Sequence, residues 1–275
     1  MELEFWGVRG THPVSGRAAS RYGLQTPSAL VVSEAGDRVI IDAGTGIIGL
    51  GRRLDRESRP AKRHDHVLLT HFHLDHIMGL PFFSPIHDKK TTITFYAPAE
   101  PAETERLLSG LMTGRYFPLD LQDTAAAKHY RKIPAQAFEI GSLRISHHPL
   151  NHPQGCLAYR IEEGGRSIVF ATDTEHPSKG MDDALADFAG GADLFIYDAT
   201  FTPGEYEAEK RGWGHSTWLE GTKLARKARV GTLVLSHLNP EYSDRALGEL
   251  VRLARQKFAR TRAAREGWTK VLRGE

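Results

Sequence analysis

The chain contains a single cysteine, Cys156, among 275 residues. One thiol cannot form an intramolecular disulfide, and it excludes a zinc site built from several cysteines. No apolar run approaches the roughly 20 residues that a membrane-spanning helix needs. The start of the chain, Met-Glu-Leu-Glu-Phe, lacks the basic and apolar regions of a secretory signal. We therefore expect a cytoplasmic protein with no membrane partner, in which Cys156 is a small buried hydrophobic residue.

Strong net charge and linker-like sequence are also missing. The formal net charge is only +2, which is too small to indicate a broad nucleic-acid-binding surface. The middle of the chain has no Pro/Ser-rich linker, low-complexity tract or block of like charges. A chain of this length with 40% hydrophobic residues can bury a large core. We expect a single domain over residues 1–275.

The most informative stretch is Thr-His-Phe-His-Leu-Asp-His at residues 70–76, directly after the apolar run 67–69. Residues i and i+2 of an extended segment point the same way, so His71 and His73 can bind one cation together. Asp75 and His76 follow a turn and face a second position close by. Imidazoles and a carboxylate suit zinc, and manganese, iron or cobalt less well. The sequence therefore predicts a metal site here.

Three more candidate ligands follow strand-like apolar runs: His152, Asp173 and His237. Because such strand ends converge at one edge of an α/β sheet, we expect these side chains to join the first cluster. His147 and His148 lie close enough in sequence to His152 to compete with it for the same role.

Hydrophobic periodicity predicts two halves, each with strands followed by helices. Expected strands are 3–6, 29–32, 39–41, 67–70, 91–96, 143–147, 157–162, 167–171, 193–197 and 232–235. Expected helices are 47–54, 101–111, 182–188 and 218–228. The stretch 244–270 is predicted as one basic helix with an apolar stripe at Leu247 and Leu250. Its charges indicate a solvated face, with contact to nucleic acid or membrane as the alternative.

These features resemble the metallo-β-lactamase fold superfamily over nearly the whole chain. The branch that includes ribonuclease Z and cyclic-phosphate phosphodiesterases is the most similar. That finer match rests on three pairs of segments: 7–11 with 41–46, 171–174 with 193–200, and 214–217 with 236–237. The resemblance implies an α/β fold, specifically a four-layer αββα sandwich, and a dinuclear metal-dependent hydrolase.

The resemblance also implies a ligand set. His71, His73 and His152 would bind the first ion, Asp75, His76 and His237 the second, and Asp173 would bridge them. The resemblance favours His152 over His147 and His148 as the third histidine ligand, because His152 opens a loop before the next strand. Two divalent cations are implied, with Zn²⁺ first and Mn²⁺ or Fe²⁺ as alternatives.

The candidate catalytic residues are His215, Asp75 and Asp198. By resemblance, His215 stabilises the transition state and protonates the leaving oxygen, a role that suits an imidazole. A structural or helix-capping role is the alternative for His215. Asp198 is expected to orient it, and Asp42 is either a similar supporting residue or part of a turn.

The expected substrate is a small or cyclic phosphodiester attacked by metal-bound hydroxide. Ribonuclease Z enzymes commonly grip RNA with a long arm between the third histidine and the bridging aspartate, but here only residues 153–172 intervene. A segment at 81–134 is predicted instead as an insertion that covers the site. The alternatives are an RNA 3′-end endonuclease of ribonuclease Z type and a lactone or thioester hydrolase. A nucleic-acid partner is not indicated, and a homodimer is left open.

Overall fold

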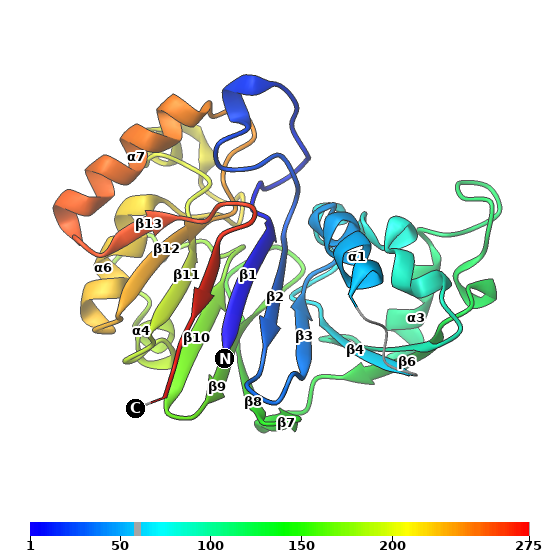
Figure 1. Cartoon of the computed structure of the whole chain (residues 1–275). Helices are drawn as coiled ribbons and strands as arrows, with labels where there is room; N and C mark the ends of the chain where they lie inside the picture. The colour runs from blue at the N-terminus through cyan, green and yellow to red at the C-terminus, as the bar shows by residue number, and fades with distance from the viewer. Residues whose placement is uncertain (58–61, 275) are drawn as a thin grey trace.

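The computed structural model describes residues 1–57 and 62–274. Two seven-stranded sheets pack face to face, and helices cover their outer surfaces (Figure 1). In spatial order, the first sheet comprises β14 (Thr269–Val271), β1 (Glu2–Gly7), β2 (Ser28–Val32), β3 (Arg38–Ile41), β4 (Arg63–Leu68), β5 (Thr91–Ala97) and β6 (Ala127–Lys132). The second comprises β13 (Thr261–Ala263), β12 (Thr232–Ser236), β11 (Leu194–Asp198), β10 (Arg166–Ala171), β9 (Cys156–Glu163), β8 (Leu143–Leu150) and β7 (Phe138–Ile140).

The helices complete the outer layers of the sandwich. The first sheet carries α1 (Gly46–Arg56) and α3 (Pro101–Ser109), and the second carries α4 (Asp183–Phe188), α6 (Trp218–Lys227) and α7 (Asp244–Lys257) (Figure 1). Two short helices, α2 (Leu74–Ile77) and α5 (Pro203–Glu205), lie in loops after strands. This is the expected four-layer αββα sandwich. Among the described residues, no helix is both long and apolar enough to cross a membrane.

Alternating side chains explain the layers. In β10, Phe170 belongs to the core between the sheets, whereas Val169 packs with the helices outside. In β3, Ile41 faces the central core and Ile40 faces the outer core under α1. Because successive strand residues point to opposite faces, a strand buried on both sides must be apolar throughout. Cys156 lies in the outer core of the second sheet at 3% exposure, which confirms it as a buried residue.

The expectation of one helix from 244 to 270 is wrong. The helix α7 ends at Lys257, and the chain then forms β13 in one sheet and β14 in the other. Arginine and alanine favour helix locally, but β13 pairs in parallel with β12 and gains the hydrogen bonds of an open sheet edge. Tertiary pairing therefore outweighs local helix propensity in this stretch.

The interpretation of residues 81–134 as an insertion also needs correction. Both β5 and β6 lie in this segment and extend the first sheet beyond β4 by parallel pairing. The helix α3 packs against β6. Most of the segment is thus part of the sandwich, and the stretch between α3 and β6 includes Tyr116 at 82% exposure.

Candidate metal centre

The candidate metal centre lies where parallel strands of both sheets end. The strands β3, β4 and β5 run parallel in one sheet, as do β10, β11 and β12 in the other. Asp42 directly follows β3, and His237 directly follows β12. Asp173 lies two residues beyond β10, and Asp198 is the last residue of β11. Because these ends meet at one edge of the sandwich, polar groups distant in sequence come together there.

The backbone at these strand ends is unusual. Asp42, Asp173 and His237 have φ angles of 60°, 62° and 54°. Residues other than glycine rarely adopt this left-handed conformation, and such residues concentrate at functional sites.

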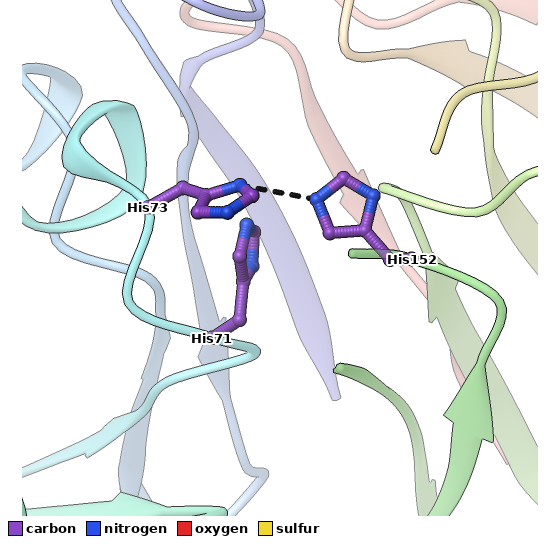
Figure 2. Close-up of side chains that lie close together, drawn as sticks. All are labelled: His71, His73 and His152. Atoms are coloured by element: carbon purple, nitrogen blue, oxygen red, sulfur yellow. Dashed lines mark hydrogen bonds between the residues drawn. The ribbon is translucent and has the colours of Figure 1, made fainter. Parts of the chain in front are cut away.

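Three histidines form the first group of candidate ligands, and their rings face one another (Figure 2). They are His71, His73 and His152, and their ligand atoms all lie within 4.8 Å of one another. Nδ1 of His73 is 3.1 Å from Nε2 of His152. Nδ1 of His152 donates to the carbonyl oxygen of Gly214 at 2.7 Å, which leaves Nε2 directed at the group.

Asp75, His76 and His237 form the second group, again with ligand atoms within 4.8 Å. Asp173 lies between the two groups. Its carboxylate oxygens are 3.3 Å from Nε2 of His76 and 3.1 Å from Nε2 of His237, and 4.0 Å from Nε2 of His71. All seven candidate ligands from the sequence therefore meet in one cluster.

The structure also distinguishes His152 from His147 and His148, the two alternative candidates for the third histidine ligand. Nε2 of His147 bonds to the carbonyl oxygen of Pro134 at 2.9 Å. The ring of His148 stacks on Phe188 with a centroid distance of 5.3 Å. Within residues 1–57 and 62–274, neither joins a group of candidate ligands, so His152 completes the histidine triad.

Two matching hydrogen-bond relays support the cluster from outside. The Thr70 hydroxyl donates to Asp42 at 3.0 Å and accepts from Nδ1 of His71 at 3.0 Å. In the other half of the sandwich, Thr200 links the Asp198 carboxylate to Nδ1 of His237, with both distances 2.9 Å. Such bonds fix the ring orientation and direct Nε2 inward. We did not predict either threonine, although each lies within two residues of an acidic or histidine candidate.

Asp42 acts on a second histidine as well. Its carboxylate accepts from Nδ1 of His76 at 2.8 Å, so Asp42 orients both His71 and His76. Asp42 was expected either to support the site or to form part of a turn, and these contacts show that it supports the site. Asp75 is held by a backbone donor, because the N–H of Thr11 bonds to its Oδ2 at 2.8 Å.

The cluster has the properties that a divalent cation requires. Nε2 of His71, Nε2 of His76 and Oδ2 of Asp173 are buried and have no hydrogen-bond partner among the residues that the structure describes. Unpartnered buried polar atoms are costly, and bound cations satisfy them. Imidazole nitrogens and carboxylates held by supporting hydrogen bonds fit zinc or a similar metal.

Burial and neighbouring charges shift the pKa values of several candidate ligands. Burial, with the neighbouring His76, lowers the pKa of His71 to about 2. Burial also lowers the pKa of His152, and both shifts favour the neutral ring at pH 7. Burial raises the pKa of Asp75 and Asp173, but the nearby histidines outweigh it and hold both well below their ordinary values. Neutral imidazoles and ionised carboxylates are the forms that bind metals.

His215 lies beside the cluster and is oriented by Asp198. Its Nδ1 donates to Oδ2 of Asp198 at 2.9 Å, and its ring stacks on His237 at 4.8 Å. Burial lowers the pKa of His215, but the Asp198 charge and hydrogen bond outweigh this and raise it to about 9. Thr217, not His215, caps α6. Nε2 of His215 is therefore the nitrogen left for proton transfer.

Asp198 is a positioning residue, because its oxygens are already occupied. Oδ1 accepts from the backbone and hydroxyl of Thr200 and from the N–H of Ser216, while Oδ2 accepts from Asp173 N and His215 Nδ1. It lies within 4.8 Å of other potential ligands, but five donors leave it little capacity to bind a cation.

Close packing leaves no room for side chains at two glycines. A Cβ at Gly10 would lie 2.3 Å from the His237 ring, and one at Gly214 would lie 2.4 Å from Nδ1 of His152. Gly214 also has φ +79°, which disfavours any other residue. Both glycines stand in the segments that carry the family resemblance.

Glu175 holds the loop that carries His215, a role that sequence reasoning missed. Its carboxylate accepts from the N–H groups of Gly212 at 2.7 Å and Gly214 at 2.9 Å, and from the Tyr206 hydroxyl at 2.7 Å. Its backbone N–H also bonds to the carbonyl of Asn151, next to His152. Through its side chain and its backbone, Glu175 thus connects the segment 206–214 with the start of the His152 loop.

We expect Glu175→Ala to lower kcat by about tenfold, because residues supporting metal ligands typically contribute 10- to 100-fold. Steady-state kinetics of the hydrolysis proposed below would measure the change, with exposed Glu209→Ala as the matched control. If Glu175 acts through His215, adding Glu175→Ala to His215→Ala should cost little more. Fully additive losses would show that Glu175 does not work by positioning His215.

Comparison with known proteins assigns the chain to a family. Residues 37–238 match the model of the beta-lactamase superfamily domain, so the chain belongs to this superfamily. It is a hydrolase of the metallo-β-lactamase type with candidate ligands for divalent metal ions.

Individual relatives agree with this assignment. A ribonuclease Z from Bradyrhizobium sp. (strain ORS 278) is 28% identical over 283 residues, covering 86% of this chain and 90% of the relative. YhfI of Bacillus subtilis, a metallo-beta-lactamase fold protein, has a TM-score of 0.73 and 24% identity, covering 98% of this chain and 99% of its own. A diphosphatase from the PhnP family has a TM-score of 0.71 and 19% identity, covering 99% and 98%. At these identities the two structures share the fold with this chain.

Proposed function

We propose that this protein is a phosphodiesterase that hydrolyses a small or cyclic phosphodiester with two divalent metal ions, Zn²⁺ in the first instance. The observation that supports it most is His215, which lies beside the ligand cluster, stacked on His237 and bonded to Asp198. Phosphodiester cleavage produces an alkoxide that needs a proton, and a held imidazole can provide it.

Each part of the cluster would have a separate task. When bound, divalent cations would lower the pKa of a water molecule and hold the phosphate oxygens. His71, His73 and His152 would bind one cation, Asp75, His76 and His237 the other, and Asp173 both. Nε2 of His215 would carry the proton for the leaving oxygen, while Asp198 fixes the ring through Nδ1. Buried, oriented groups need no rearrangement as charge develops, which favours the transition state.

The preference for a small substrate rests on the chain between His152 and Asp173. Residues 156–163 and 166–171 form adjacent antiparallel strands joined at Gly164 and Gly165. This tight hairpin leaves no room for the RNA-binding arm that the ribonuclease Z resemblance implies. A small phosphate substrate for this chain is also consistent with its likeness in fold to a diphosphatase from the PhnP family.

An RNA 3′-end endonuclease is the second candidate, and the 28% identity to a ribonuclease Z supports it. Thioester hydrolysis is less well supported, because a thiolate leaves without a proton and gives the His215–Asp198 pair no clear task. A lactone hydrolase is the third candidate.

A side-by-side assay tests these functions. Purified protein would be analysed for bound metal and given bis(p-nitrophenyl) phosphate, cyclic nucleotides, a 3′-extended transfer RNA, a cephalosporin and a thioester. We expect metal-dependent cleavage of the phosphodiesters, with a cyclic nucleotide preferred to the RNA. Faster cleavage of the RNA would favour the endonuclease, and reaction of the thioester or cephalosporin alone would overturn the phosphodiesterase proposal.

A further inference from the structure

A hollow of about 600 Å³ lies between α7 and the C-terminal strands, and none of the metal-centre residues lines it. Figure 1 shows α7 and β13 side by side at this end of the molecule. Five arginines and a tryptophan are among the lining residues: Arg21, Arg252, Arg255, Arg262, Arg265 and Trp268. We call this the arginine hollow.

Three of the arginines lack an anionic partner. Among residues 1–57 and 62–274, the structure records no ion pair for Arg21, Arg262 or Arg265. Of the other two, Arg252 pairs with Glu249, and Arg255 donates to the carbonyl of Thr261 at 2.8 Å.

One carboxylate lies at the start of α7 and another follows Arg265, and both accept backbone N–H groups. Asp244 accepts the N–H groups of Arg21 and Tyr22 at 2.8 and 3.3 Å. Glu266 accepts those of Leu24 and Gln25 at 2.7 and 2.5 Å. Within the described residues, neither carboxylate forms an ion pair with an arginine of the hollow.

Aromatic rings hold two of the unpaired guanidinium groups in place. Arg262 lies over the Trp268 ring at 5.1 Å, and Arg21 lies over Tyr22 at 5.4 Å. Stacking occupies the flat face of a guanidinium but leaves the N–H groups along its edge free. Those edges are the part of arginine that binds phosphate oxygens in pairs.

A solvated basic face would spread its charges, but here arginines from three separate segments converge on one hollow. Positive charges that line one hollow repel one another, so an anion bound among them stabilises the arrangement. We propose that the arginine hollow binds a compact anion with two or more phosphate groups, such as a nucleoside triphosphate or inorganic triphosphate. A monophosphate carries about two negative charges at neutral pH, fewer than the three unpaired guanidiniums, so the proposed ligand has two or more phosphate groups.

The shape favours a compact ligand over a nucleic-acid strand. The volume lies within the usual range of small-molecule sites, whereas a strand is followed by an extended basic groove or stripe. The low net charge of +2 is also consistent with a local anion site. This binding is independent of the hydrolysis proposed above, because the two sites share no residue.

Calorimetric titration of the metal-loaded protein with inorganic triphosphate tests the proposal, with adenosine triphosphate as a second ligand. We expect the combined variant Arg21→Gln, Arg262→Gln and Arg265→Gln to weaken binding by at least about 50-fold, because charge-assisted hydrogen bonds are strong. A control with the same charge change, Arg56→Gln, Arg106→Gln and Arg226→Gln, should stay within about threefold of the unmodified protein. Lysine at the same three hollow positions should give an intermediate loss, because it keeps the charge without the paired donors.

Metals at the catalytic cluster could also hold triphosphate, so the titration is repeated with Asp173→Asn. Retained affinity there supports the hollow, and phosphodiester hydrolysis by the arginine variant should stay within about twofold of normal. Unchanged binding by the arginine variant, or binding lost with Asp173→Asn, would overturn the proposal. So would tenfold tighter binding of a 12-nucleotide RNA with a steep salt dependence, which would identify a nucleic-acid track instead.

Discussion

Replacing Asp173 with asparagine should reduce metal-dependent hydrolysis by about a thousandfold or more and lower the bound metal below two per chain. Asp173 lies between both ligand groups, and its carboxylate contacts His71, His76 and His237 within 4.0 Å. Asparagine keeps the size and also tolerates the left-handed backbone at φ 62°, so the change removes chiefly one negative charge. Elemental analysis and steady-state kinetics would measure both effects.

The exposed carboxylate of Asp187, changed to asparagine, is the matched control and should leave metal content and rate unchanged. The bridging role of Asp173 would be wrong if Asp173→Asn kept both metals and near-normal turnover. Loss of metal accompanied by a large drop in melting temperature would indicate a folding defect, which circular dichroism would detect.

His215→Ala is expected to lower kcat by about 10²- to 10⁴-fold while metal content stays the same, because it removes the proton donor and no proposed ligand. The loss should be smaller for bis(p-nitrophenyl) phosphate than for a substrate with an alkoxide leaving group. A nitrophenolate leaves without help, whereas an alkoxide needs a proton as the bond breaks. Comparing kcat for the two substrates measures this difference.

His147→Ala is a suitable control, since His147 bonds to the Pro134 carbonyl away from the cluster. An equal loss for both leaving groups with His215→Ala would argue for electrostatic stabilisation by His215 in place of proton donation. Full activity would remove His215 from the mechanism.

Much of the site could be predicted because its chemistry is concentrated in short segments. His71, His73, Asp75 and His76 come from seven consecutive residues, and their spacing on a strand-to-helix turn already indicates ligation. Asp173 and His237 each follow a strongly apolar strand, which places them at a sheet edge from sequence alone. Their supporting partners were harder to predict, because Thr70 and Thr200 are common residue types with no distinguishing pattern.

Local patterns failed where a distant partner decides the outcome. Residues 258–271 have helix-favouring composition, yet two short strands form there because β12 and β1 offer open edges. Glu175 has no motif, and its role depends on backbone N–H groups that come close only after the loop at 212–214 folds.

The sequence by itself determined the fold class, the family and the cluster of candidate ligands, because residue type and spacing encode both the alternating core and the metal chemistry. Only the tertiary structure showed that Asp42 supports two histidines, tied Glu175 to the loop that carries His215, and brought five arginines together. Those outcomes depend on which strand ends and loops meet in space. Strand register and packing determine which of these segments come into contact, and no short stretch of sequence contains that information.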